Sequence, residues 1–127
     1  MLITYAGSGY QPDFEVRYQF LSLADGGREH PPHQRMRSDF LYEGDEPQTG
    51  TYMVWPEFID EAGLIRPMDE VPMEGLARMF VVNPKMLPFH LERLQVGTRG
   101  FFMEGVRKVA TCEVTRVLKL PVIETPA

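Results

Sequence analysis

A strict alternation of apolar and polar residues from Phe14 to Phe20 is the feature that most constrains the fold. A period of two predicts a strand with one buried face, and these aromatic and β-branched residues suit a pleated surface. Residues 25–27, Asp-Gly-Gly, then supply the positive φ angles that a tight reversal needs. A second alternating run covers residues 36–42. We therefore predict two antiparallel strands joined by a charged connection that two prolines stiffen.

The rest of the chain predicts further short strands. Residues 51–59 are β-like, but Pro56 cannot donate to a ladder and confines the segment to an edge or a strand end. Residues 64–71 resemble a short strand followed by a turn, and residues 74–82 fit a strand bounded by prolines. Residues 86–96 predict a loop or a short helix. Residues 99–104 and 108–118 form a second hairpin, in which Ala110, Cys112 and Val114 face one way.

Six or more short antiparallel strands at regular spacing predict a closed barrel or a sandwich. Closure is attractive because it removes unpaired strand edges, which invite aggregation. We divide the chain into an N-terminal extension (residues 1–13), one β-domain (residues 14–120) and a flexible tail (residues 121–127). The extension holds a short apolar run at residues 2–5, which is either a frayed tail or an edge strand.

Composition narrows the function classes. The chain has 127 residues, enough for one core, and a formal net charge of -5, which argues against a generic polyanion binder. Cys112 is the only cysteine, so no intrachain disulfide can form, and its mid-strand position predicts a small buried hydrophobic residue. No segment approaches the roughly 20 apolar residues of a membrane helix, and the first residues lack a signal-peptide pattern. We expect a soluble, cytoplasmic protein.

With both hairpins placed, the chain resembles the C-terminal β-barrel domain of bacterial elongation factor Tu and its relatives. The likeness covers about residues 14–118, and its most specific parts are the Gly-Gly-Arg connection and the last hairpin. The matching residues are Gly26, Gly27, Arg28, His30, Pro31, Arg37 and Phe40, the turn at residues 66–69, and residues 99–101, 104–107 and 117–118. The resemblance implies a closed six-stranded antiparallel Greek-key barrel.

In that family the barrel contacts the T-stem backbone of tRNA, packs on the GTPase domain and meets the exchange factor. Carried over by position, the tRNA-facing residues are Arg28, Arg37, Glu104 and Gly105. The chain departs from the pattern at Met68 and Met103, and its segment 83–97 is longer than the family's connection. No GxxxxGK[ST] loop is present, so the sequence predicts neither nucleotide binding nor GTPase activity.

The densest polar cluster surrounds the connection between the first two runs. Its members are Arg28, Glu29, His30, His33, Arg35 and Arg37. A metal site needs three or four ligands, and no Cys or third His lies near His30 and His33, so we predict no metal. The three arginines suit phosphate oxygens, but ordinary surface charge on a barrel strand explains them equally well. The carboxylates of residues 60–74 lie in turns, and no nucleophile with a recognisable partner appears, so we predict no enzyme and no cofactor.

Two hypotheses on function remain. The first is a non-catalytic binding module that engages a protein partner, in an adaptor, immunity-like or competitor role. The second is binding of tRNA or other structured RNA through the face between Arg28 and Arg37. A candidate protein interface is the aromatic group Tyr52, Trp55 and Phe58 around Pro56. The sequence allows a monomer or a homodimer and predicts no membrane association.

Overall fold

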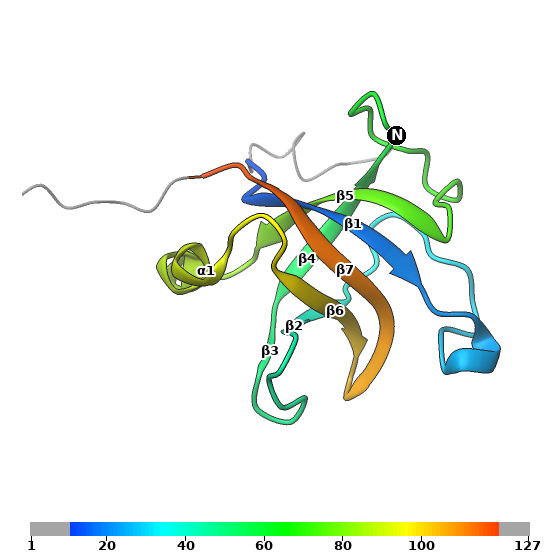
Figure 1. The fold of residues 1–127 in the computed structure, drawn as a ribbon. Coiled ribbons are helices and arrows are strands. Elements are labelled where there is room, and N and C mark those ends of the chain that lie inside the picture. Colours follow the sequence, from blue (N-terminus) through cyan, green and yellow to red (C-terminus); the bar gives the residue numbers. More distant parts are fainter. Residues whose placement is uncertain (1–10, 120–127) are drawn as a thin grey trace, which may run out of the picture.

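The computed structural model describes residues 11–119, which form a single β-sheet of seven antiparallel strands and one short α-helix (Figure 1). The strand order across the sheet is β3-β2-β6-β7-β1-β5-β4. The elements are β1 (Phe14–Phe20), the 3-10 helix η2 (Leu23–Asp25), β2 (Asp39–Tyr42), β3 (Thr51–Tyr52), β4 (Val54–Ile59), β5 (Glu74–Val81), η3 (Pro84–Met86), α1 (Leu87–Arg93), β6 (Arg99–Glu104) and β7 (Arg107–Val117).

The alternation that predicts β1 is confirmed. Phe14, Val16, Tyr18 and Phe20 are buried, and β1 lies in the interior of the sheet between β5 and β7. The hairpin of β6 and β7 is also confirmed, and Cys112 is buried as expected. The strand predicted at residues 74–82 is β5, and the short helix allowed for residues 86–96 is α1.

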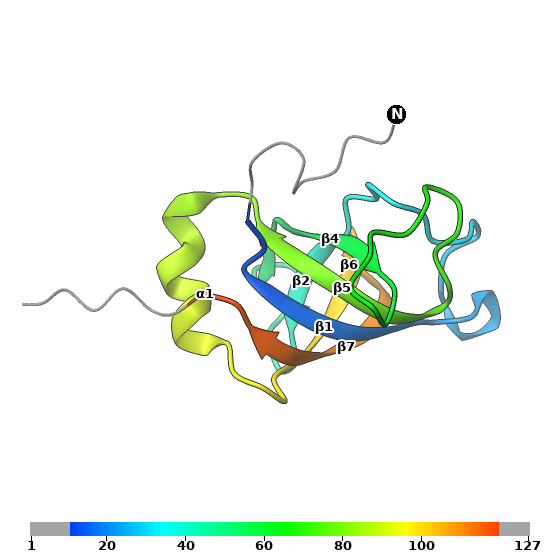
Figure 2. The same ribbon diagram turned by 90° about the horizontal axis from the view of Figure 1, so that it is seen from above.

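The prediction of a closed six-stranded barrel is wrong. The sheet has seven strands and curls strongly, but β3 and β4 are its two free edges, so it is an open half-barrel (Figure 2). Pro56 lies in the edge strand β4, where the sequence placed it, because an edge tolerates a residue without an N–H group.

One prediction of strand pairing and one prediction of a strand are also wrong. β1 does not pair with the second alternating run, because β2 pairs with β3 and β6 instead. Only residues 39–42 of that run form a strand. Residues 64–71 form no strand and contribute a single bridge between Ile65 and Ile59. The alternation of apolar and polar residues therefore predicted correctly which side chains face the core, but it did not predict which strands pair with each other.

Gln34 takes the place of a strand partner on the open edge of β4. Its Nε2 donates to the carbonyl oxygens of Phe58 (2.6 Å) and Arg66 (3.0 Å), and its Oε1 accepts the Phe58 N–H (2.9 Å). Gln34 is only 1% exposed. The Gln34 side chain, together with the Arg66 N–H that donates to the Phe58 carbonyl oxygen at 3.1 Å, thus satisfies the backbone of β4 at Phe58, where a closed barrel would have used another strand.

Aromatic rings fill the concave side of the sheet. Tyr18 packs on Phe58, Phe20 and Phe102 with ring centroids 5.0, 5.4 and 6.1 Å apart. Their edge-to-face and stacked arrangements are the favourable geometries for ring pairs. The apolar run at residues 2–5 and the tail at 121–127, both considered in the sequence, lie outside the described residues.

Candidate functional site

The connection after β1 positions the first group of predicted site residues. Gly26 has a φ angle of 92° and ends η2. A Cβ on Gly27 would lie 2.0 Å from the Leu21 carbonyl oxygen, so only glycine fits where the chain doubles back. This path brings Arg28 to the β6–β7 turn. The Arg28 Nε atom lies 3.0 Å from Glu104 Oε1, and Arg28 Nη1 donates to Met36 Sδ at 3.1 Å.

Glu104 also contacts a second arginine. Its Oε2 atom lies 3.4 Å from Arg107 Nη2, across the turn that contains Gly105 with a φ angle of 61°. The structure therefore unites three residues that the sequence assigned to one site: Arg28, Glu104 and Gly105. The Arg28 side chain is only 14% exposed, and its guanidinium already has a carboxylate partner. We call Arg28, Glu104 and Arg107 the ion-pair cluster.

The other members of the polar connection do not join this cluster. His30 and Arg35 are exposed, and Arg35 has a φ angle of 67°. His33 Nδ1 lies 2.7 Å from the Gln34 carbonyl oxygen. The Arg37 guanidinium lies 5.1 Å from the centre of the Trp55 ring, in a cation–π contact with β4. Arg28 and Arg37 thus have separate partners.

The three residues of the predicted aromatic interface, Tyr52, Trp55 and Phe58, also lie in separate surroundings. Phe58 is 0% exposed and belongs to the core, so its side chain offers no surface to a partner. Trp55 is partly buried beneath Arg37. Tyr52 is partly buried and packs against Phe89 and His90 of α1, with centroids 5.3 and 4.9 Å apart. These three side chains do not form one exposed patch.

An apolar groove that the sequence did not predict lies beside the ion-pair cluster. Its volume is about 340 Å³, and it opens between the connection after β1 and the segment that leads into β5. Leu23 is 63% exposed and Met73 is 47% exposed, and both line this groove. We call this the Leu23–Met73 groove. It is lined by Phe20, Leu21, Leu23, Arg28, Glu29, His30, Pro31, Pro32 and Met73. The only sign of this groove in the sequence was that apolar residues occur inside turn segments.

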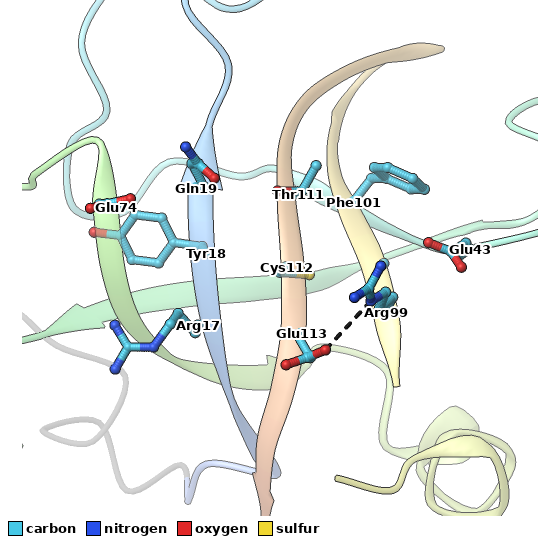
Figure 3. Close-up of a pocket in the computed structure, with 11 residues that line it drawn as sticks. Arg17, Tyr18, Gln19, Glu43, Glu74, Arg99, Phe101, Thr111, Cys112 and Glu113 are labelled. Carbon is cyan, nitrogen blue, oxygen red and sulfur yellow. Dashed lines mark hydrogen bonds and ion pairs between the residues drawn. The ribbon is translucent and has the colours of Figure 1, made fainter. Parts of the chain in front are cut away.

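A larger hollow of about 500 Å³ lies on the outer face of β5, β1, β7 and β6 (Figure 3). Its walls carry charges of both signs, among them Arg17, Glu74 and the exposed pair Arg99–Glu113, whose Nε–Oε1 distance is 3.4 Å. Cys112 also lines it, but burial raises the pKa of this thiol well above its usual range. A thiol held in the neutral form is a poor nucleophile. This hollow therefore presents mixed surface charge and no activated group.

No family model matches the chain, and no curated protein matches it. The assignment of a site thus depends on geometry alone. Within residues 11–119, no three His, Cys, Asp or Glu side chains are grouped as metal ligands would be. No helix in that range is long and apolar enough to cross a membrane.

Proposed function

We propose that this protein is a non-catalytic binding module, related to the C-terminal domain of elongation factor Tu, which engages a protein partner through the Leu23–Met73 groove. The observation that supports this most is the exposure of two large apolar side chains over a concave apolar surface. Apolar side chains gathered in a pocket are the usual anchors of protein recognition.

The groove favours a partner segment with one large apolar side chain and basic neighbours. Its volume of about 340 Å³ has room for such an anchor. Glu29 lines the groove, and Asp25 and Glu74 are sequence neighbours of its walls. The whole chain carries a net charge of -5. In a segment with Lys or Arg on either side of a Leu, Phe or Trp, the apolar side chain would fill the apolar groove. The basic side chains would lie near the acidic residues named above.

The ion-pair cluster supports the proposal by fixing the groove wall. Arg28 lines the groove, and its bonds to Glu104 and Met36 hold the connection against the β6–β7 turn. A groove whose walls are already ordered loses little conformational entropy on binding.

The experiment compares capture by the wild-type protein with capture by groove variants. A photo-crosslinking residue at position 23 should yield a defined protein adduct in a bacterial lysate. The adduct should be lost when Met73→Asp is added. Leu64, which is 66% exposed and outside the groove, provides the matched control, so Leu64→Asp should leave the adduct intact. Equal yields from the Met73→Asp and wild-type proteins would refute the groove as the docking surface.

Binding of RNA through the face between Arg28 and Arg37 is the other outcome of this test. Recovery of tRNA with the bait, with a steep loss of binding as salt rises, would favour it over a protein partner. The structure gives this alternative less support, because Arg28 is already paired with Glu104. Arg35 and Arg37 are the exposed arginines that it would use.

A further inference from the structure

Three methionines of the described chain are exposed to solvent: Met53 by 52%, Met68 by 37% and Met73 by 47%. Oxidants convert the thioether of an accessible methionine to a sulfoxide, which is a polar group. Of these three residues, Met73 lines the Leu23–Met73 groove, whereas Met53 and Met68 lie outside it. Oxidation at Met73 would therefore change the chemical character of the groove itself.

The backbone of Met73 is fixed although its side chain is exposed. Its carbonyl oxygen accepts the Phe20 N–H at 2.7 Å, which joins the end of β1 to the segment before β5. Phe20 also lines the groove. A change at the Met73 sulfur leaves this backbone hydrogen bond in place, so it alters the groove surface without breaking the contact that shapes the groove.

Two other sulfur-containing side chains are protected from oxidants. Met36 is buried, and its Sδ accepts a hydrogen bond from Arg28 Nη1 at 3.1 Å. Cys112, the only cysteine of the chain, is also buried. An oxidant in solution therefore reaches Met73 before it reaches either of these residues.

We propose that Met73 is an oxidation site that controls the Leu23–Met73 groove: the thioether permits binding of an apolar anchor, and the sulfoxide weakens it. This inference rests on the proposed function of the groove. The oxidant is a peroxide. With hydrogen peroxide, an electron pair of the sulfur attacks one oxygen, and the O–O bond breaks as the S–O bond forms. The proton of the transferred oxygen moves to the leaving oxygen, which departs as water, so sulfur is oxidised and peroxide reduced by two electrons.

The sulfoxide weakens binding because it places a polar oxygen where an apolar side chain must make contact. An anchor that covers this oxygen removes its hydration. The Arg28 guanidinium lines the groove, but it is already bonded to Glu104 and Met36. Burying a polar group without a partner should weaken binding about tenfold, toward the lower end of the range for such groups.

The test uses the probe peptide acetyl-Lys-Lys-Phe-Lys-Lys-amide, which has the apolar anchor and basic neighbours that the groove favours. In NMR titrations of the untreated wild-type protein, the amides of Leu23 and Met73 should shift until they saturate. Hydrogen peroxide is then applied until mass spectrometry finds Met73 oxidised and Met36 unmodified. The affinity for the peptide should fall about tenfold. Methionine sulfoxide reductases for both sulfoxide epimers should restore it.

Variants show whether Met73 is the methionine responsible. Met73→Leu keeps the groove apolar but cannot be oxidised there, so peroxide should leave its affinity for the peptide unchanged. Met68→Leu, outside the groove, is the matched control and should lose affinity on peroxide treatment as the wild-type protein does. Unchanged affinity of the oxidised wild-type protein, or an equal loss in peroxide-treated Met73→Leu, would overturn the proposal.

A further variant needs no oxidant. Met73→Gln places a neutral polar group in the groove, so it should bind the peptide about as weakly as the oxidised wild-type protein. Wild-type affinity in Met73→Gln would contradict the inference, as would the absence of peptide binding to the untreated wild-type protein. The proposed function is judged separately, by the crosslinked adduct from position 23, so it can stand where the oxidation site fails.

Discussion

At the scale of single residues, the burial of His90 makes the stability of the fold depend on pH. Burial, followed by the charge of Arg93, lowers its pKa to about 4 in the folded protein, against about 6.5 in the unfolded chain. Between these values only the unfolded chain binds the proton. Stability is therefore lost as pH falls through this window, by up to about 3 kcal/mol. Urea denaturation at a series of pH values should show this loss.

Two variants separate this effect from general acid sensitivity. His90→Phe removes the titrating group, so its stability should fall less between pH 6.5 and pH 4 than that of the wild-type protein. Tyr42→Phe removes the hydrogen bond to His90 Nδ1 but leaves the ring buried, so its loss should resemble that of the wild-type protein. A His90→Phe profile parallel to the wild-type profile would contradict this account.

Gln34 gives a second prediction at this scale. Gln34→Glu keeps the acceptor for the Phe58 N–H but sets a buried carboxylate against the Phe58 and Arg66 carbonyl oxygens. The folded state should then favour the protonated acid, so stability relative to the wild-type protein should recover as pH falls from 7 to 5. Gln34→Leu should cost about 3 kcal/mol at both pH values, because it leaves a buried N–H unpaired. Chemical denaturation distinguishes the two patterns.

At the scale of elements, the sequence predicted strands well and their pairing poorly. Alternation located β1 and β7 because each buries one face, and glycine marked the turns that follow β1 and β6. Pairing depends on contacts between distant segments, such as β1 with β5 and β7, which no local pattern encodes. For residues 64–71 the predicted turn is confirmed by the hydrogen bond from the Glu70 N–H to the Pro67 carbonyl oxygen (3.2 Å). The predicted strand is wrong, because these residues form a loop that contacts β4 only locally, through Ile65 and Arg66.

The same limit applied to the candidate site. Arg28, Glu104 and Gly105 were predicted together through a family resemblance, not through spacing, and the structure does place Arg28 against Glu104. Leu23 and Met73 lie about 50 residues apart in the sequence and meet only because β1 and β5 are neighbours. No periodicity could have revealed the Leu23–Met73 groove.

The ion-pair cluster makes a testable link between two elements. A double-mutant cycle with Arg28→Met and Glu104→Gln should give a coupling energy of about 1 kcal/mol, because the Arg28 side chain is largely buried. Arg17 and Glu61, whose side chains are 56% and 70% exposed, form the control pair. Their coupling should be smaller, since water screens an exposed pair. Similar coupling in the two cycles would show that the cluster does not fix the connection.

At the scale of the whole molecule, an open half-barrel should be least stable along the open side of its edge strand β4, which we call the seam. Amide directions alternate along a strand, so Pro56 has its missing N–H on the side where the Phe58 N–H meets Gln34. That side of β4 has the Gln34 side chain and a short backbone contact with residues 64–66 in place of a full strand ladder, whereas β1 is paired on both sides.

Hydrogen exchange should reveal this difference. The Phe58 amide should exchange through local opening of the seam, faster than the Tyr18 amide, which should exchange only on global unfolding. Gln34→Leu should accelerate exchange at Phe58 beyond the change expected from its loss of global stability. If Phe58 and Tyr18 exchange at the same opening free energy in the wild-type protein, the seam opens only with the whole sheet. The half-barrel would then behave as one cooperative unit despite its open edges.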